Sequence, residues 1–95
     1  MAAKHKKTHR KARLLVSERA LRQHFSAFNK GFFDGKIHPK TVVKYENLAK
    51  HHCTGIWRPL DQELAIDYRV AQLSEHYLLS TLLHEMAHAY LDAQG

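Results

Sequence analysis

The stretch LLHEMAHAYL, residues 82–91, decides the fold of this chain and contains the pattern His-Glu-x-x-His. Residues four apart share one face of a helix, so His84 and His88 can point toward the same ion. Neutral imidazoles at this spacing bind Zn²⁺, and we predict a zinc site at these two histidines. Glu85 lies beside the ligands rather than among them. There its carboxylate can act as a general base toward zinc-activated water.

The helix around this motif is predicted to begin after Ser74, which can cap it. Leu73 and Leu78 have the spacing of a hydrophobic staple. The stripe that we expect to face the core consists of Leu79, Leu82, Leu83, Met86 and Tyr90. The histidines and Glu85 lie on a different arc of the same helix. A polar strip in such an apolar helix is costly unless it has a function.

The remaining residues predict a second helix and three strands. Apolar residues at spacings of three and four indicate a first helix after the Ser17 cap, with Gly31 or Gly35 as its end: Leu21, Phe25, Phe28 and Phe32. Residues 41–48, 53–59 and 63–71 are rich in β-branched and aromatic side chains, which is typical of strands. The short links favour antiparallel neighbours. We therefore predict an α+β fold of helix, three-stranded antiparallel sheet and metal-binding helix.

Length and composition limit the class of protein. The chain has 95 residues, of which 44% are hydrophobic and 25% charged, as expected for one small globular domain. Its single cysteine, Cys53, excludes an internal disulfide and favours a reducing, intracellular compartment. We find no apolar segment typical of a secretory signal or long enough to cross a membrane.

The net charge of +6 comes from the start of the chain, where six cations precede any acid: Lys4, Lys6, Lys7, Arg10, Lys11 and Arg13. From these we predict a flexible basic arm over residues 1–16 and a domain over residues 17–95. Such an arm suits the phosphate backbone of nucleic acid, because each neutralised phosphate releases counterions. The alternative is a solvated tail without a partner. A membrane surface fits less well, since the arm has no apolar face.

Three stretches resemble the SprT-like family of zinc metallopeptidases, which includes bacterial SprT proteins and the eukaryotic Spartan DNA–protein crosslink proteases. NKGFFDGKI, residues 29–37, is similar to the family's turn after the first helix. CTGIWRPLDQELAIDYRVA, residues 53–71, is similar to its strand pair. STLLHEMAHAYL, residues 80–91, resembles its catalytic helix most closely.

The resemblance implies a small zincin fold and peptide hydrolysis with a zinc cofactor. It assigns His84 and His88 as zinc ligands and Glu85 as the general base, with proteins as substrates, including proteins held on DNA. It also implies a third histidine ligand a little beyond the second. His76 and Asp92 each lie eight residues from His84, about 12 Å along the helix axis, which is too far to complete the site. His51 and His52 belong to a loop whose position the sequence does not indicate.

Two interpretations follow from the missing third ligand. The chain is either part of a longer protease or a naturally short relative, and in both cases we expect the 95 residues to be incomplete as an enzyme. Two further functions stay open beside the zinc metallopeptidase. One is a non-catalytic nucleic-acid-binding or interaction module that uses the basic arm. The other is a structural protein with an accidental motif. No pattern indicates an oligomeric state.

Overall fold

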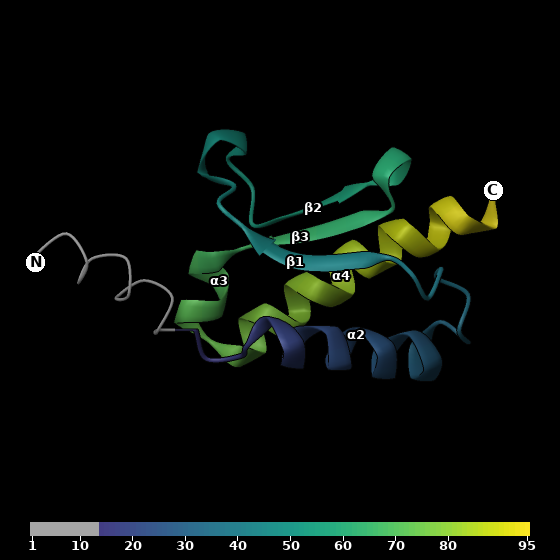
Figure 1. Cartoon of the computed structure of the whole chain (residues 1–95), viewed down its shortest axis with the longest axis horizontal. Helices are drawn as coiled ribbons and strands as arrows, with labels where there is room; N and C mark the ends of the chain where they lie inside the picture. The colour runs from purple at the N-terminus through teal and green to yellow at the C-terminus, as the bar shows by residue number, and fades with distance from the viewer. Residues whose placement is uncertain (1–13) are drawn as a thin grey trace, which may run out of the picture.

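The computed structural model describes residues 14–95, and the six cations of the predicted nucleic-acid-binding arm lie outside this range. The elements follow the order α2 (Glu18–Phe32), β1 (Val42–Glu46), the short 3₁₀ helix η1 (Ala49–His51), β2 (Gly55–Arg58), the 3₁₀ helix η2 (Pro59–Asp61), β3 (Glu63–Asp67), α3 (Tyr68–Leu73) and α4 (Glu75–Gln94). Figure 1 shows α2 and α4 on the same side of the sheet. The predicted α+β architecture is confirmed.

α2 begins where its cap predicts. The Ser17 Oγ accepts a hydrogen bond from the Ala20 amide at 3.0 Å, which satisfies one of the free N–H groups of the first turn. Just before the cap, Val16 is buried and Leu14 packs against the core. Residues 14–16, assigned to the arm from the charge pattern, thus contact the domain because two of their apolar side chains find space in its core.

Asn29 holds the end of α2 to the segment that enters β1. Its side-chain amide donates to the Ile37 carbonyl at 2.8 Å, and its Oδ1 accepts from the Ile37 amide at 3.0 Å. The helix ends at Phe32, so Gly31 lies inside it. Gly35 takes the left-handed conformation, with φ of 71°, and its amide donates to the Asn29 carbonyl at 2.8 Å.

The sheet is mixed, which corrects the antiparallel arrangement predicted from the short links. Its order is β1-β3-β2, with β1 parallel to β3 and β2 antiparallel to β3. β3 has a neighbour on each edge, and its Leu64, Ala65 and Ile66 are buried, whereas every residue of β2 is only partly buried. A strand that is buried on both faces gains from a neighbour on each edge. The link between β1 and β2 therefore carries the chain past the position of β3.

β3 ends at Asp67, so the predicted strand 63–71 is wrong in its last part, where α3 begins. The buried Asp67 carboxylate accepts hydrogen bonds from the Arg69 amide at 2.8 Å and the Leu48 amide at 2.9 Å. Burial opposes its charge, but these bonds and the Arg69 guanidinium prevail and lower the pKa of Asp67. A carboxylate that caps the next turn favours a helix over continued strand.

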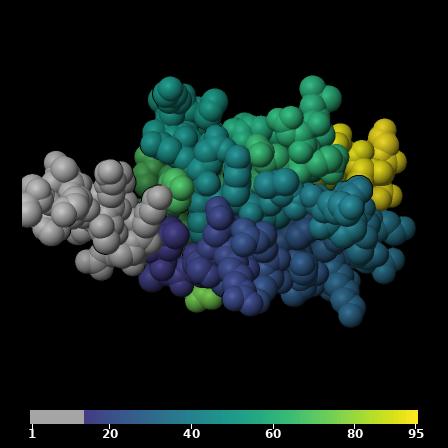
Figure 2. All heavy atoms as spheres, viewed as in Figure 1, coloured from purple at the N-terminus to yellow at the C-terminus, as the bar shows by residue number. Residues whose placement is uncertain are grey.

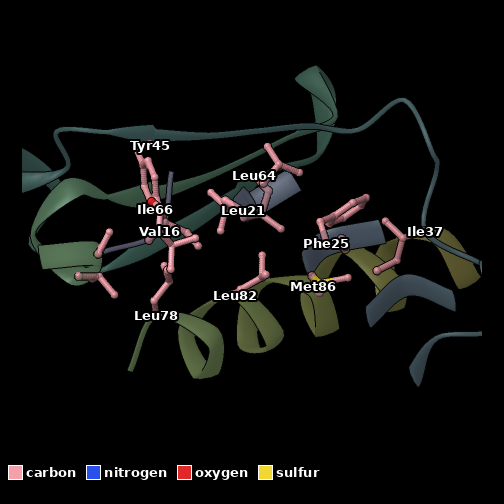
Figure 3. Packing of buried hydrophobic residues seen from close by; sticks show 14 residues of the cluster. Val16, Leu21, Phe25, Ile37, Tyr45, Leu64, Ile66, Leu78, Leu82 and Met86 are labelled. Carbon is pink, nitrogen blue, oxygen red and sulfur yellow. The ribbon is translucent and has the colours of Figure 1, made fainter. Parts of the chain in front are cut away.

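The core lies between the sheet and the two long helices. Figure 3 shows side chains from all of these elements meeting there. The core contains Val16, Leu21, Phe25, Ile37, Val43, Tyr45, Leu64, Ile66, Val70, Ala71, Leu78, Leu82, Met86 and Ala89. Burial of this apolar surface is the main stabilising contribution to a domain of this size.

The buried stripe of α4 differs from the predicted one. Its buried apolar residues are Leu78, Leu82, Met86 and Ala89, while the predicted members Leu79, Leu83 and Tyr90 are only partly buried. Leu73 is 70% exposed, so the predicted staple does not bury it. The sheet and α2 contact α4 from directions that shift its buried arc by about one residue, which helical periodicity cannot indicate. Within residues 14–95, no helix is long and apolar enough to span a membrane.

Charged side chains alternate with the buried residues of β1 and continue onto its neighbours. Arg58 donates to Glu46 at 2.9 and 3.0 Å and to Glu63 at 2.8 Å. The Lys44 Nζ lies 3.1 Å from Glu63. Hydrogen bonds from these cations lower the pKa of both glutamates. The cluster joins all three strands on the sheet face that the helices leave open.

Candidate metal centre and catalytic site

α4 carries the histidine pair in its middle. The helix starts at the Ser74 cap, whose Oγ accepts from the Tyr77 amide at 3.1 Å, and extends to Gln94. The rings of His84 and His88 are exposed, with centroids 4.9 Å apart and an interplanar angle of 78°. A single helical turn therefore presents two imidazoles side by side to solvent.

Glu85 lies on the arc of α4 that faces the sheet, next to β2, and is only 8% exposed. A Cβ added at Gly55, the first residue of β2, would lie 2.9 Å from the Glu85 Cγ and 3.3 Å from its Oε2. Carbon atoms do not pack at the shorter of these distances without a shift of the structure. A glycine at the start of β2 is therefore what lets the Glu85 side chain pass so close to the strand.

Thr81 forms the other wall of this narrow space. It is buried, and its hydroxyl donates to the Tyr77 carbonyl at 2.9 Å, within its own helix. Its Cγ2 would lie 3.1 Å from a Cβ at Gly55. The methyl of Thr81 and the backbone of Gly55 together leave the Glu85 side chain little freedom to move.

The pKa of Glu85 is raised. Burial disfavours the charged carboxylate and is the largest cause, while the nearby imidazoles of His84 and His88 act in the opposite direction. A carboxylate with a raised pKa accepts protons better near neutral pH than an exposed one. The electrostatics of this turn thus suit proton transfer by Glu85.

The donor chemistry fits zinc in part. Two neutral imidazoles on one helical turn are nitrogen ligands of the kind that zinc prefers. In residues 14–95, no three His, Cys, Asp or Glu side chains come together in an arrangement that could hold a metal ion. The described chain therefore offers two of the four ligands of tetrahedral zinc. The others would be water or groups from outside this range.

The remaining candidate ligands do not join the pair. His76 and Asp92 are exposed residues of α4 itself. His51 ends η1 and His52 follows it in the left-handed conformation, with φ of 54°, and both are exposed. Cys53 is partly buried just before β2. Within the part of the chain that the structure describes, none of them forms a three-ligand group with His84 and His88.

Two hollows lie beside α4, one near each end of β2. The first has a volume of about 310 Å³ and is lined by residues that include His52, Cys53, Thr54 and Tyr77. The second, of about 430 Å³, is lined by residues that include His38, Trp57, Ala89 and Asp92. The Trp57 Nε1 is buried without a hydrogen-bonding partner among the described residues.

Sequence reasoning did not identify Gly55 and Thr81 as neighbours of Glu85. A glycine that opens a strand is a weak signal of close backbone approach. It could have drawn attention to Gly55, but it does not say which side chain approaches. Thr81 has no such signal in the sequence, because its proximity to Glu85 arises only where α4 meets β2.

A comparison with known protein families finds a match for most of the chain. A model of the SprT-like family matches residues 21–94, a span that runs from α2 to the last turn of α4. No curated protein and no solved structure matches the chain.

Proposed function

Because the chain belongs to the SprT-like family, we propose that it forms the zinc-binding part of a metallopeptidase, with His84 and His88 as ligands and Glu85 as general base. One observation carries the proposal. A single turn of α4 exposes the imidazoles of His84 and His88 to solvent and buries the carboxylate of Glu85, which lies between them in the sequence. Metal ligands need access to an ion, whereas a base gains from the partial desolvation that raises its pKa.

The side chains have distinct roles in this proposal. Zinc held by His84 and His88 supplies Lewis acidity toward water and a peptide carbonyl. Glu85 takes a proton from the attacking water and passes it to the leaving amine. Gly55 and Thr81 restrict the Glu85 side chain, so its carboxylate stays in place between these two transfers. Glutamine at this position would have no base, and aspartate would be shorter by one methylene.

The edge of β2 supports an extended peptide as the substrate. β2 pairs only with β3 within the described sheet, and its first residue, Gly55, contacts the Glu85 side chain. At the other edge of the sheet, by contrast, the Tyr45 amide of β1 donates to the Glu18 carboxylate at 2.9 Å. A peptide added to β2 gains main-chain hydrogen bonds and passes close to the proposed base.

We propose further that the protein substrates include proteins bound to DNA inside the cell. The support for the nucleic-acid partner is the basic arm of residues 4–13, which lies outside the described residues. The support for an intracellular location is the single cysteine. A non-catalytic role of the arm remains the alternative, and it requires no metal.

We expect zinc binding and catalysis by the 95 residues alone to be weak. Two protein ligands leave the rest of the shell to water, and affinity falls with each missing ligand. A donor from outside the described residues is required for the three protein ligands and one open position of a catalytic zinc site. The zinc-binding claim can nevertheless be tested in this chain.

The test compares zinc content in three forms of the full chain after dialysis against the same free zinc concentration. Replacing both His84 and His88 by Ala should remove most of the bound zinc, as measured by elemental analysis. The matched control replaces the exposed pair His51 and His52 by Ala, which removes the same number of imidazoles. The proposal fails if both double variants retain as much zinc as the wild type, or if only the control loses it.

A further inference from the structure

The exposed face of α2 forms a shallow basic surface. A hollow of about 710 Å³ there is lined by Arg19, Arg22, Gln23, Ser26, Ala27 and Lys30. No acidic side chain lines it, although Arg22 lies 3.6 Å from Glu18 on the same helix. Arg19 and Lys30 form no ion pair within residues 14–95.

Helical periodicity explains why these residues gather. The buried residues of α2 are Leu21, Phe25 and Asn29, which face the core at spacings of four. The lining residues recur at spacings of three and four on the opposite arc, so they point away from the domain. The core that orients α2 therefore also fixes the direction of its cations.

Charge is segregated within the domain, although the total over residues 17–95 is balanced. Residues 17–40 contain five Lys or Arg and two Asp or Glu, whereas residues 41–95 contain four Lys or Arg and seven Asp or Glu. The positive part is thus the first helix and its link to β1. The six cations of residues 4–13 precede it directly in the sequence.

The basic surface is separate from the proposed zinc site. α2 lies beside β1, at the opposite edge of the sheet from β2, which is next to Glu85. Figure 2 shows α2, in purple to blue, at the surface along one long side of the molecule, with teal and green atoms of the later segments along the other. A partner on α2 would leave the edge of β2 open.

We propose that the exposed face of α2 binds the phosphate backbone of nucleic acid without reading the base sequence. Arg19 and Lys30 are about 16 Å apart along the axis at 1.5 Å per residue, which corresponds to roughly five steps of 3.4 Å along duplex DNA. The amide of Gln23 and the hydroxyl of Ser26 lie between them and can donate to phosphate oxygens.

Two features favour nucleic acid over an anionic membrane surface. The hollow contains no large apolar side chain, since Ala27 is its one apolar lining residue. Interfacial helices instead bury a broad apolar face in the lipid, and the apolar face of α2 is buried in the core of the domain. This inference stands apart from the proposed peptidase activity, because it involves neither zinc nor Glu85.

The experiment measures binding of the full chain to a labelled duplex of about 20 base pairs by fluorescence anisotropy between about 50 and 200 mM salt. Two double variants with the same change of charge are compared: Arg19→Gln with Lys30→Gln, and the control Lys40→Gln with Lys50→Gln. All four side chains are exposed, so the folds should be retained, and far-ultraviolet circular dichroism checks this.

In the α2 variant, the slope of log K against log salt should be smaller in magnitude by about 1.8, because each of the two lost phosphate contacts contributes about 0.9. Its deficit relative to wild type should then be about tenfold larger at the low-salt end than at the high-salt end. The control should retain the wild-type slope. A control deficit as large as that of the α2 variant would mean delocalised attraction and overturn the proposal. The proposal would also be overturned if the α2 variant bound DNA as tightly as the wild type but had lost binding to anionic vesicles.

Discussion

The two long sides of this molecule differ in how they treat polar groups. On the side of α2 and β1, the Tyr45 amide donates to Glu18, and the Tyr45 hydroxyl donates to the Val16 carbonyl at 2.8 Å. Burial raises the pKa of Tyr45 to about 12, so this hydroxyl remains a donor at any physiological pH. On the side of α4 and β2, the imidazoles of His84 and His88 face solvent. Glu85 is buried, and within residues 14–95 these two rings are the groups that favour its charged form.

We infer that the paired polar groups beside α2 and β1 serve stability, whereas those beside α4 and β2, which are unpaired within residues 14–95, serve a site. Polar groups that pair with one another stabilise a fold and leave nothing for a ligand. A buried carboxylate and an open strand edge cost free energy, and natural proteins tolerate such features where they serve a site. The side of α4 and β2 is therefore where polar groups are arranged in a way that does not maximise the stability of the fold. Four substitutions measure this contrast.

The largest effect is expected at Glu85. Glu85→Gln preserves size but removes the base, so peptide cleavage should fall by about 10² or more in kcat/KM. This prediction applies to a longer form of the protein that supplies a third zinc ligand. In the 95-residue chain we expect little cleavage with or without the substitution. Cleavage of an unstructured protein at equal zinc occupancy provides the measurement.

The glutamine should still fit beside Gly55, so zinc content and the midpoint of thermal unfolding should change little. A loss of zinc in Glu85→Gln would make the carboxylate a ligand and contradict its role as the base. Unaltered cleavage by the longer form would contradict the proposed mechanism itself.

Gly55→Ala should destabilise the fold by about 1–3 kcal/mol, the range of overpacking in a filled space. The new methyl would meet the Glu85 Cγ at 2.9 Å and the Thr81 Cγ2 at 3.1 Å, so α4 or β2 must move. The matched control is Gly31→Ala inside α2, where no atom lies within 4 Å of the added methyl. It should stabilise by about 0.5–1 kcal/mol. Urea unfolding of both variants checks the opposite signs, and equal effects would exclude the close contact.

Asp67→Asn should cost about 1–2 kcal/mol at neutral pH, because it weakens hydrogen bonds to a buried charge. The native pKa of Asp67 lies below its ordinary value of 3.8, so its stabilisation is present above that value. It is lost as the pH falls through the lowered native pKa. The difference in unfolding free energy between wild type and Asp67→Asn should therefore shrink below about pH 4.

Denaturant unfolding at several pH values measures this difference. The exposed Asp61→Asn serves as the control and should stay within about 0.5 kcal/mol of wild type. A deficit of Asp67→Asn that does not change with pH would show that the native pKa is not lowered.

The smallest effect is expected at Glu18, the first-turn acid of α2. Glu18→Ala removes the acceptor of the Tyr45 amide and should cost about 1 kcal/mol. Glu75→Ala is the control, since Glu75 is an exposed first-turn acid of α4 and shares only the favourable interaction with the helix dipole. Thermal unfolding measures both. Equal losses would mean that the bond to β1 adds nothing, and the two sides of the molecule would then be less different than we infer.

Much of the fold was predictable because its signals are local. Ser17 and Ser74 cap α2 and α4 within hydrogen-bonding distance of the next turn, and apolar spacing indicates both helices. The grouping of His84, Glu85 and His88 follows from a spacing of four residues, about one helical turn, since one helix brings its own residues together. No knowledge of the rest of the chain is needed for these inferences.

Other features depended on contacts between segments far apart in the sequence. The predicted antiparallel sheet was wrong because strand order is set by which strand is buried on both faces, and short links do not reveal that. The predicted strand 63–71 continued too far because the capping of α3 by Asp67 is stabilised by the distant Leu48 amide. Strand propensity alone does not include either effect.

The sequence by itself indicated the two long helices, the three strands, the His-Glu-x-x-His pattern and the cluster of six cations at the start of the chain. The tertiary structure decided the place of β3 in the sheet, the contact of Glu85 with Gly55, and the direction of the α2 cations away from the core. Periodicity assigns residues to a face of an element, because backbone geometry repeats along the chain. What that face meets is fixed by packing of the whole domain, in which each element takes the position that buries the most apolar surface and satisfies its buried polar groups.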